Sequence, residues 1–270
     1  MKGLLRKIIM EVRWPVLVFG FGLAVILSVL TALVPRILRD MGALLGFLPW
    51  LRPIFTAMMG MDPQNLSPRE LMQAFLWVHP TVLSIIWAHE LMFTSRIPAG
   101  EIDRGTVDFL LGLPISRWKL YLAETTGFLL TGVTIIGLGY SGHLITTLFL
   151  QPDMRPQMIL TVYIVSNLLA VYLAVGGLSF LVSSFCDRRG KAIGVMFAML
   201  LISFLLNFLA QFWEPAKTIA VLSIMEYYRP AIIIQEEAFA TKNVLILVVI
   251  GLTAWIAGGV VFRRRSVCTV

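Results

Sequence analysis

The chain has 270 residues, of which 58% are hydrophobic and 14% are charged, and its net charge is +7. An ordinary soluble domain is about one quarter charged, so this composition indicates a membrane protein. The apolar segments leave little chain for a soluble catalytic domain. The basic residues gather at the ends of apolar segments, which argues that the positive charge sets membrane topology and does not serve nucleic-acid binding.

Six apolar segments are long enough to cross a membrane as α-helices, which takes about 17 to 25 residues. They cover approximately residues 16–34, 71–93, 125–150, 159–185, 192–213 and 244–262. Their apolar residues run continuously and do not alternate with period two, which excludes a transmembrane β-barrel. We therefore predict one all-α, polytopic transmembrane domain with six spans over residues 1–270.

The positive charges predict the orientation of these spans. Most of the 22 Lys and Arg residues lie before the first span, after the second, after the fourth and after the last. The positive-inside rule therefore places both termini in the cytoplasm. The first apolar segment is longer than the core of a signal peptide and no small-residue cleavage site follows it, so we predict an uncleaved first helix.

Residues 1–14 form an amphipathic pattern ahead of the first span. Leu5, Ile8, Ile9 and Val12 recur at helical spacing with Lys and Arg between them. This pattern predicts a helix that lies in the cytoplasmic membrane interface. A basic cytoplasmic tail is the alternative.

The sequence also predicts the structure of two long outer loops and the role of several glycines in the spans. The loop at 35–70 contains four prolines and the apolar piece "ALLGFLPWL", which predicts short pieces that partly enter the membrane surface. The loop at 214–243 contains "AVLSIMEYYRPAIII", which fits a short helix or a re-entrant hairpin. Close helix packing is predicted at small residues, namely Gly127, Gly132, Gly137, Gly139, Gly142, Gly176 and Gly177.

A charged segment at residues 101–119 separates the second and third spans. Val107, Leu110, Leu111 and Pro114 follow the i, i+3, i+4, i+7 spacing, and Phe109 and Leu113 widen the apolar side. This predicts a short amphipathic cytosolic helix that Pro114 ends. On composition alone, a solvated connector is the better explanation of such a segment.

The sequence "EIDRGTVDFLLGLPISRWKLYLAE" resembles the segment that membrane subunits of type-2 ATP-binding-cassette (ABC) exporters carry between their second and third spans. The positions that match are Glu101, Gly105, Thr106, Asp108, Leu110, Leu111, Leu113, Pro114, Ser116 and Arg117. Weaker similarity covers "SSFCDRRGKAIGV" at 183–195, "LSIMEYYRPAIII" and the C-terminal "FRRR". The loop at 35–70 has no counterpart that we can align.

The resemblance implies a permease subunit of an ATP-driven exporter in the bacterial inner membrane. It implies pairing with a second copy or a homologous permease, a translocation path at that interface, and two cytosolic ATPase subunits that bind ATP and Mg. Residues 101–119 would be the coupling helix docked on the ATPase, with Asp103 and Val107 added to the matching positions and Arg104, Asp108 and Arg117 setting its orientation. No cofactor is expected in this chain, which lacks the G-x-x-x-x-G-K-[ST] motif.

Three ionisable residues near the cytoplasmic ends of the spans are further candidates, because charge at membrane depth is expensive. One hypothesis is that His89, Glu90 and Glu124 form an intramembrane polar cluster that gates or links motion. The favoured alternative is that the two glutamates reach interface water or pair with Arg96 or Arg117. No metal site is predicted, since "HELMF" fails the H-E-x-x-H pattern of zinc proteases.

Two other classes of protein are alternatives to a transporter subunit. "GYSGH", residues 139–143, resembles the G-x-S-G of rhomboid intramembrane serine proteases, but His143 lies only two residues after Ser141 on a different side of the same helix. A passive channel or a structural membrane subunit is the third class, and no ring of charges or filter-like loop supports a channel. We therefore predict no catalytic residue in this chain.

Overall fold

The computed structural model describes residues 2–39, 46–107, 109, 112 and 114–265, and these residues form helices and no strands. Within them, six segments are long and apolar enough to cross a membrane. They are Gly3–Ile37, Pro68–Thr94, Arg117–Thr147, Pro152–Phe185, Arg189–Leu209 and Thr241–Arg264. The prediction of an all-α protein with six membrane-spanning segments is confirmed.

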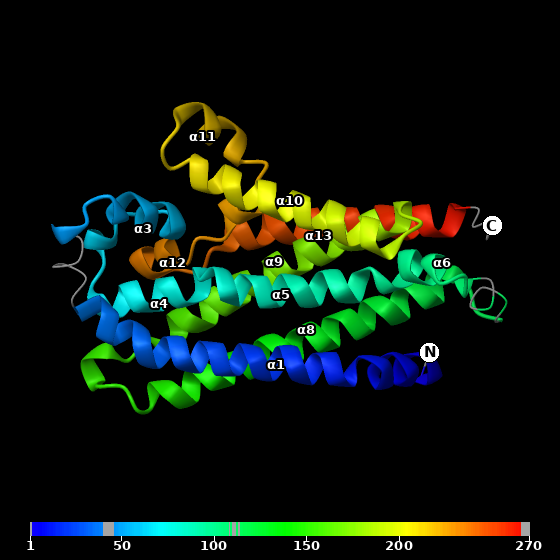
Figure 1. The fold of residues 1–270 in the computed structure, drawn as a ribbon, viewed down its shortest axis with the longest axis horizontal. Helices are drawn as coiled ribbons and strands as arrows, with labels where there is room; N and C mark the ends of the chain where they lie inside the picture. The colour runs from blue at the N-terminus through cyan, green and yellow to red at the C-terminus, as the bar shows by residue number, and fades with distance from the viewer. Residues whose placement is uncertain (1, 40–45, 108, 110–111, 113, 266–270) are drawn as a thin grey trace.

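The long helices lie roughly side by side along one axis (Figure 1). They are α1 (Lys2–Arg39), α4 (Pro68–Val78) followed by α5 (Pro80–Thr94), α8 (Arg117–Thr147), α9 (Met158–Phe185), α10 (Arg189–Leu209) and α13 (Thr241–Arg264). Short elements connect them: α3 (Leu51–Met59), η1 (Pro63–Asn65), η2 (Arg96–Gly100), α6 (Glu101–Asp103), η3 (Pro152–Met154), α11 (Glu214–Ala220), η4 (Ile224–Tyr227) and α12 (Pro230–Glu236).

The two ends of the bundle differ. Figure 1 shows both chain termini and α6 at one end, which we call the terminal end. The opposite end, which we call the loop end, holds α3 and α12. An even number of spans brings the termini to one side, as predicted, while the assignment of that side to the cytoplasm stays a prediction.

The second span is a pair of helices because of its sequence. Helix α4 begins with a capping box in which Ser67 Oγ accepts the Glu70 N–H (3.4 Å) and the Glu70 carboxylate accepts the Ser67 N–H (2.8 Å). Pro80 has no N–H to continue the hydrogen-bond ladder, so α4 ends at Val78 and α5 restarts at Pro80. His79 Nδ1 caps the restart by accepting the Thr81 N–H at 3.3 Å.

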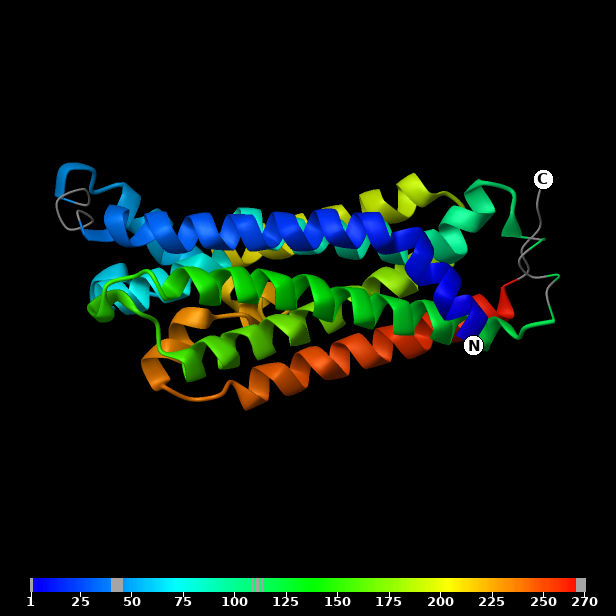
Figure 2. The same ribbon diagram turned by 90° about the horizontal axis from the view of Figure 1, so that it is seen from below.

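Glycines allow two helix pairs to pack with backbones in contact. Helix α1 lies along α8, and α9 lies along α13 (Figure 2). A Cβ atom at Gly142 would lie 2.5 Å from the Ala24 carbonyl oxygen, and one at Gly177 would lie 2.1 Å from the Gly251 carbonyl oxygen. Both glycines therefore serve close packing, as predicted, whereas a Cβ at Gly137 would have open space around it among the described residues.

The predicted interfacial helix at 1–14 is helical but is not a separate element. Helix α1 runs without interruption through Pro15, and Figure 2 shows its N-terminal part bent away from the rest. Ile8 and Val12 are buried, and Ile8 packs over Gly127 of α8. This segment is thus attached to the bundle through its apolar side, because the absent side chain of Gly127 leaves room for Ile8.

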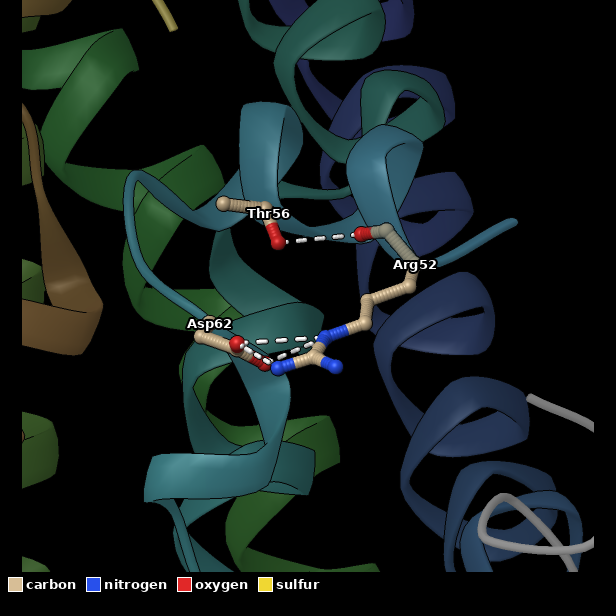
Figure 3. A network of polar contacts seen from close by, with 3 residues as sticks. All are labelled: Arg52, Thr56 and Asp62. Carbon is tan, nitrogen blue, oxygen red and sulfur yellow. Dashed lines mark hydrogen bonds and ion pairs between the residues drawn. The ribbon is translucent and has the colours of Figure 1, made fainter. Parts of the chain in front are cut away.

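Short helices at the loop end are fastened by polar contacts. Arg52 Nε donates to Asp62 Oδ2 (3.1 Å) and Oδ1 (3.3 Å), and its Nη2 also contacts Oδ2 (Figure 3). Thr56 Oγ1 donates to the Arg52 carbonyl oxygen at 2.9 Å. The hydrogen bond and the negative charge of Asp62 raise the pKa of Arg52 above its ordinary value. In the loop at 214–243, the structure has two short helices, α11 and α12.

Candidate functional site

The charged segment between α5 and α8 lies at the terminal end (Figure 1). It begins with η2 and α6, turns at Gly105, and is helical at Val107 and Phe109. Asp108, Leu110, Leu111 and Leu113 lie outside the described residues, so the predicted apolar face is placed only in part. Val107 is 1% exposed, but Phe109 is 79% exposed and presents a large apolar surface.

Three of the predicted residues shape the turn before this helix. Gly105 has φ +70°, a left-handed conformation that favours glycine. The Thr106 N–H donates to the Glu101 carbonyl oxygen at 3.0 Å, and Thr106 Oγ1 donates to the Glu101 carboxylate. Thr106 therefore contacts both the backbone and the side chain of Glu101 across a turn that Gly105 permits, which explains the spacing of the acidic residue and the Gly-Thr pair.

Asp103 contacts the start of the fifth span. Its Oδ2 accepts the N–H of Arg189, the first residue of α10, at 3.2 Å. The N-terminus of a helix has free N–H groups and a partial positive charge, so a carboxylate there is stabilising. Asp103 thus supplies from α6 the cap that the side chain of Arg188, the residue before α10, does not supply.

The side chain of Arg189 forms hydrogen bonds with the end of α5. Its Nη2 donates to the Met92 carbonyl oxygen (2.9 Å) and its Nε donates to Ser95 Oγ (3.2 Å), both near the end of α5. The two contacts of Arg189 and the cap by Asp103 tie together α5, α6 and α10. We call this set, Ser95, Asp103 and Arg189, the α10 joint.

The side chains of Ser116 and Arg117 form hydrogen bonds within this chain. Ser116 Oγ caps α8 by accepting the Lys119 N–H at 3.3 Å. Arg117 Nη1 donates to the carbonyl oxygen of Phe262 (3.1 Å) and to that of Arg265, at the end of α13. Arg104 and Pro114 are exposed. Of the three residues predicted to set orientation on a partner, Arg104 thus lies on the surface, Arg117 is engaged in the chain, and Asp108 lies outside the described residues.

Two further basic residues hold this region together. Arg96 of η2 forms an ion pair with Glu11 of α1. Arg265 donates to the carbonyl oxygens of Ser184 (2.8 Å) and Cys186 (3.0 Å) and pairs with Asp187. The segment from 95 to 117 is therefore connected by polar contacts to the first, fifth and sixth spans.

The three intramembrane candidates, His89, Glu90 and Glu124, differ in their surroundings. His89 packs among aromatic rings, with its Nδ1 3.5 Å from the Tyr172 hydroxyl. Glu90 is fully buried, and neither of its carboxyl oxygens has a hydrogen-bond partner among the described residues. Glu124 is 3% exposed and its charged neighbours include Arg96 and Glu11.

The alternative for the two glutamates is wrong for Glu90. A residue with no exposed surface in this chain does not reach interface water. Arg96 is engaged by Glu11, and Arg117 by carbonyl oxygens of α13. Within the described part of the chain, Glu90 thus lacks the partner that the interior of a membrane protein normally provides.

The geometry around Ser141 gives no support to protease chemistry. Ser141 Oγ donates to the Leu138 carbonyl oxygen at 2.7 Å, inside its own helix. His143 Nδ1 instead lies 2.8 Å from Thr31 Oγ1 of α1, and its ring packs on Trp77. Ser141 and His143 therefore have separate partners and do not form a nucleophile–base pair.

Six helical segments of membrane-spanning length, with a charged connecting segment hydrogen-bonded to several of them at one end, define a multi-pass membrane protein. The model of the family described as "ABC-2 family transporter protein" matches residues 86–267. This is more than half of the chain, so the chain belongs to the ABC-2 family, the membrane subunits of type-2 ABC transporters. It is accordingly a permease subunit that associates with an ATP-binding subunit. Searches of curated proteins and of solved structures found no match.

Proposed function

We propose that this chain is the permease subunit of an ATP-driven exporter in the bacterial inner membrane. It works as a dimer, with a second copy or a homologous permease, and the translocation path follows the dimer interface. Two cytosolic ATPase subunits bind ATP and Mg and dock on residues 101–119. The observation that carries this proposal is the segment from 95 to 117, which joins three spans at one end while presenting Phe109 outward.

Movement of the docked segment reaches the spans through the α10 joint. Asp103 and Arg189 make α6 and the start of α10 one unit, so displacement of α6 by the ATPase displaces α10. Toward its other end, α10 forms hydrogen bonds with η4. Ser203 Oγ accepts the Ile224 N–H (3.0 Å), and Asn207 Nδ2 donates to Glu226 (3.0 Å). Helix α10 therefore transmits motion from the terminal end to the loop end.

Copurification and ATPase stimulation test the docking. Phe109→Asp places a charge on the exposed apolar side chain, and Asp108→Arg or the pair Leu110→Glu and Leu111→Glu alters the rest of the predicted face. We expect each change to leave the permease in the membrane and to weaken recovery of the ATP-binding subunit at least about tenfold, the effect of 1.4 kcal/mol of lost binding.

Phe47→Asp is the matched control, because Phe47 is also highly exposed (86%) and precedes α3, at the loop end. It should recover the ATP-binding subunit as the unaltered chain does. Retention of complex and of ATPase stimulation in all three docking variants would refute the docking of residues 101–119. Export itself is tested by inside-out vesicles, in which ATP should drive substrate into the lumen.

A further inference from the structure

A groove of about 330 Å³ runs along the membrane-spanning part of the molecule between α8 and α13. One wall carries Leu122, Thr126 and Leu129 of α8, the other wall carries Leu252 and Trp255 of α13, and α9 forms the floor at Gly177. Figure 2 shows these three helices together, with α9 between the other two. Among the described residues that line this groove, none is charged.

Two glycines, Gly177 of α9 and Gly251 of α13, line the groove without side chains. Gly177 and Gly251 bring the backbones of α9 and α13 into contact, since a Cβ on either would lie within 2.6 Å of a carbonyl oxygen of the other helix. Helices α8 and α13 meet closely toward the terminal end. There the Tyr121 hydroxyl donates to the Trp255 carbonyl oxygen (2.8 Å) and Trp255 Nε1 donates to Thr125 Oγ1 (2.8 Å). The aromatic side chains thus close one end of the groove.

The open side of the groove faces the surroundings of the spans. Leu122 is 39% exposed, Leu129 is 38% exposed and Leu252 is 53% exposed. In a bilayer the surroundings of the spans are hydrocarbon, so an exposed apolar groove there is suited to an acyl chain and not to water. A chain in the groove would contact three helices at once, whereas a lipid on a convex helix surface contacts only one.

Exposed basic residues lie where the headgroup of such a lipid would lie. Lys119 is exposed one turn before Leu122 on α8, and Arg263 and Arg264 are exposed at the end of α13. Trp255 precedes Arg263 by eight residues, which is about 12 Å along a helix. This length suits the distance between a lipid phosphate and the part of the acyl chain nearest to the headgroup. Trp118 packs on Trp255 at this level, as aromatic residues do at membrane interfaces.

We propose that the groove between α8 and α13 binds one acyl chain of an anionic phospholipid from the leaflet at the terminal end, with its phosphate held by Lys119, Arg263 and Arg264. The proposal rests on the chain spanning a membrane and is independent of the direction of transport. The bound lipid braces α8 against α13, two of the helices to which the segment from 95 to 117 is connected.

Quenching of Trp255 fluorescence by brominated lipids tests this site. The full chain with its ATP-binding subunit is reconstituted with increasing fractions of phosphatidylglycerol or of phosphatidylcholine, each brominated on the acyl chain. The difference between the unaltered chain and Trp255→Phe gives the Trp255 signal. Each basic residue near the surface contributes about a fivefold preference for an anionic lipid, so half-maximal quenching should need at least about fivefold less phosphatidylglycerol than phosphatidylcholine.

Variants separate a bound lipid from bulk lipid. Thr126→Phe or Leu252→Phe fills the groove and should remove the quenching at low phosphatidylglycerol, while Val133→Phe, on the exposed side of α8 outside the groove, should keep it. Replacing Lys119, Arg263 and Arg264 with Gln should remove the preference between the lipids. Equal quenching by both lipids in the unaltered chain, or unchanged quenching in both groove-filling variants, would overturn the proposal. Recovery of the ATP-binding subunit with the groove-filling and Val133→Phe variants verifies their fold and tests the docking proposal separately. The fold of the Gln variant is verified by its thermal unfolding temperature, because Lys119 belongs to the proposed docking segment.

Discussion

Glu90 is buried in the second span, and neither carboxyl oxygen has a hydrogen-bond partner in the part of the chain that the structure describes. A buried polar group without a partner costs about 1–3 kcal/mol, and more when it is charged. Among the described residues, the carboxyl therefore makes no hydrogen bond that would stabilise this conformation. It is retained at a cost, which favours a role in another conformation, where the helices present a partner to it.

We expect Glu90→Gln to leave the thermal unfolding temperature of the detergent-solubilised complex unchanged or higher, because the amide is neutral and has the same shape. Transport per ATP hydrolysed should fall, because the replacement removes the charge that the second conformation uses. Both quantities are measured on one reconstituted preparation. A clearly lower unfolding temperature would mean that Glu90 has a stabilising partner in this conformation, and unchanged transport would remove the gating role.

The residues that fasten the coupling segment show what could be predicted from the sequence and what could not. Gly105 and Thr106 were predicted as site residues, because the Gly-Thr pair resembles a family pattern, and Gly105 has a positive φ. Arg189 and Arg265 appeared in the sequence only as basic residues at helix ends. Their functions depend on the carbonyl oxygens of Met92, Ser184 and Cys186, which are partners that neither periodicity nor composition identifies.

The helices themselves were predicted well in number and less well in extent. Hydropathy placed the third span at 125–150, but α8 begins at Arg117, because Trp118 and Tyr121 pack on α13 and Ser116 caps the helix. A hydropathy window excludes this first part of α8 because Arg117, Lys119 and Glu124 are charged. The same window joins α4 and α5 into one span, and only the proline rule reveals the interruption at Pro80.

The α10 joint makes a prediction about one helix. Asp103→Leu removes the acceptor of the Arg189 N–H, and loss of a helix N-cap costs about 0.5–2 kcal/mol. We expect this variant to recover the ATP-binding subunit and to hydrolyse ATP, but to transport less substrate per ATP, since α6 is no longer fixed to α10. The measurement is the ratio of transport to hydrolysis in proteoliposomes.

Asp103→Asn is the matched control for the joint. Its amide oxygen still accepts the N–H of Arg189, so its transport per ATP should remain close to that of the unaltered chain. If the Asp103→Asn and Asp103→Leu variants behave alike, the cap does not transmit motion. A loss of ATPase recovery in the Asp103→Leu variant would instead assign Asp103 to the docking surface.

At the scale of the whole molecule, the proposed mechanism requires the terminal end to face the cytoplasm, because the ATP-binding subunits are there. The exposed basic residues at this end, among them Lys119, Lys191 and Arg263, support that orientation through the positive-inside rule. Single cysteines test it in a chain whose Cys186 and Cys268 are replaced by serine. Gly190→Cys lies at the terminal end, where a Cβ meets no described atom within 4 Å, and Asp153→Cys lies in η3, between α8 and α9 at the loop end.

A membrane-impermeant maleimide added to intact cells should label the cysteine at position 153, and it should label the one at position 190 only after the membrane is permeabilised. Both sites are exposed, so a difference between them reports the side of the membrane and not local burial. Labelling of both cysteines after permeabilisation controls for folding and expression. The reverse pattern would place residues 101–119 outside the cell, where no cytosolic ATPase can push them, and the docking segment, the α10 joint and the path to the loop end would all lose their source of force.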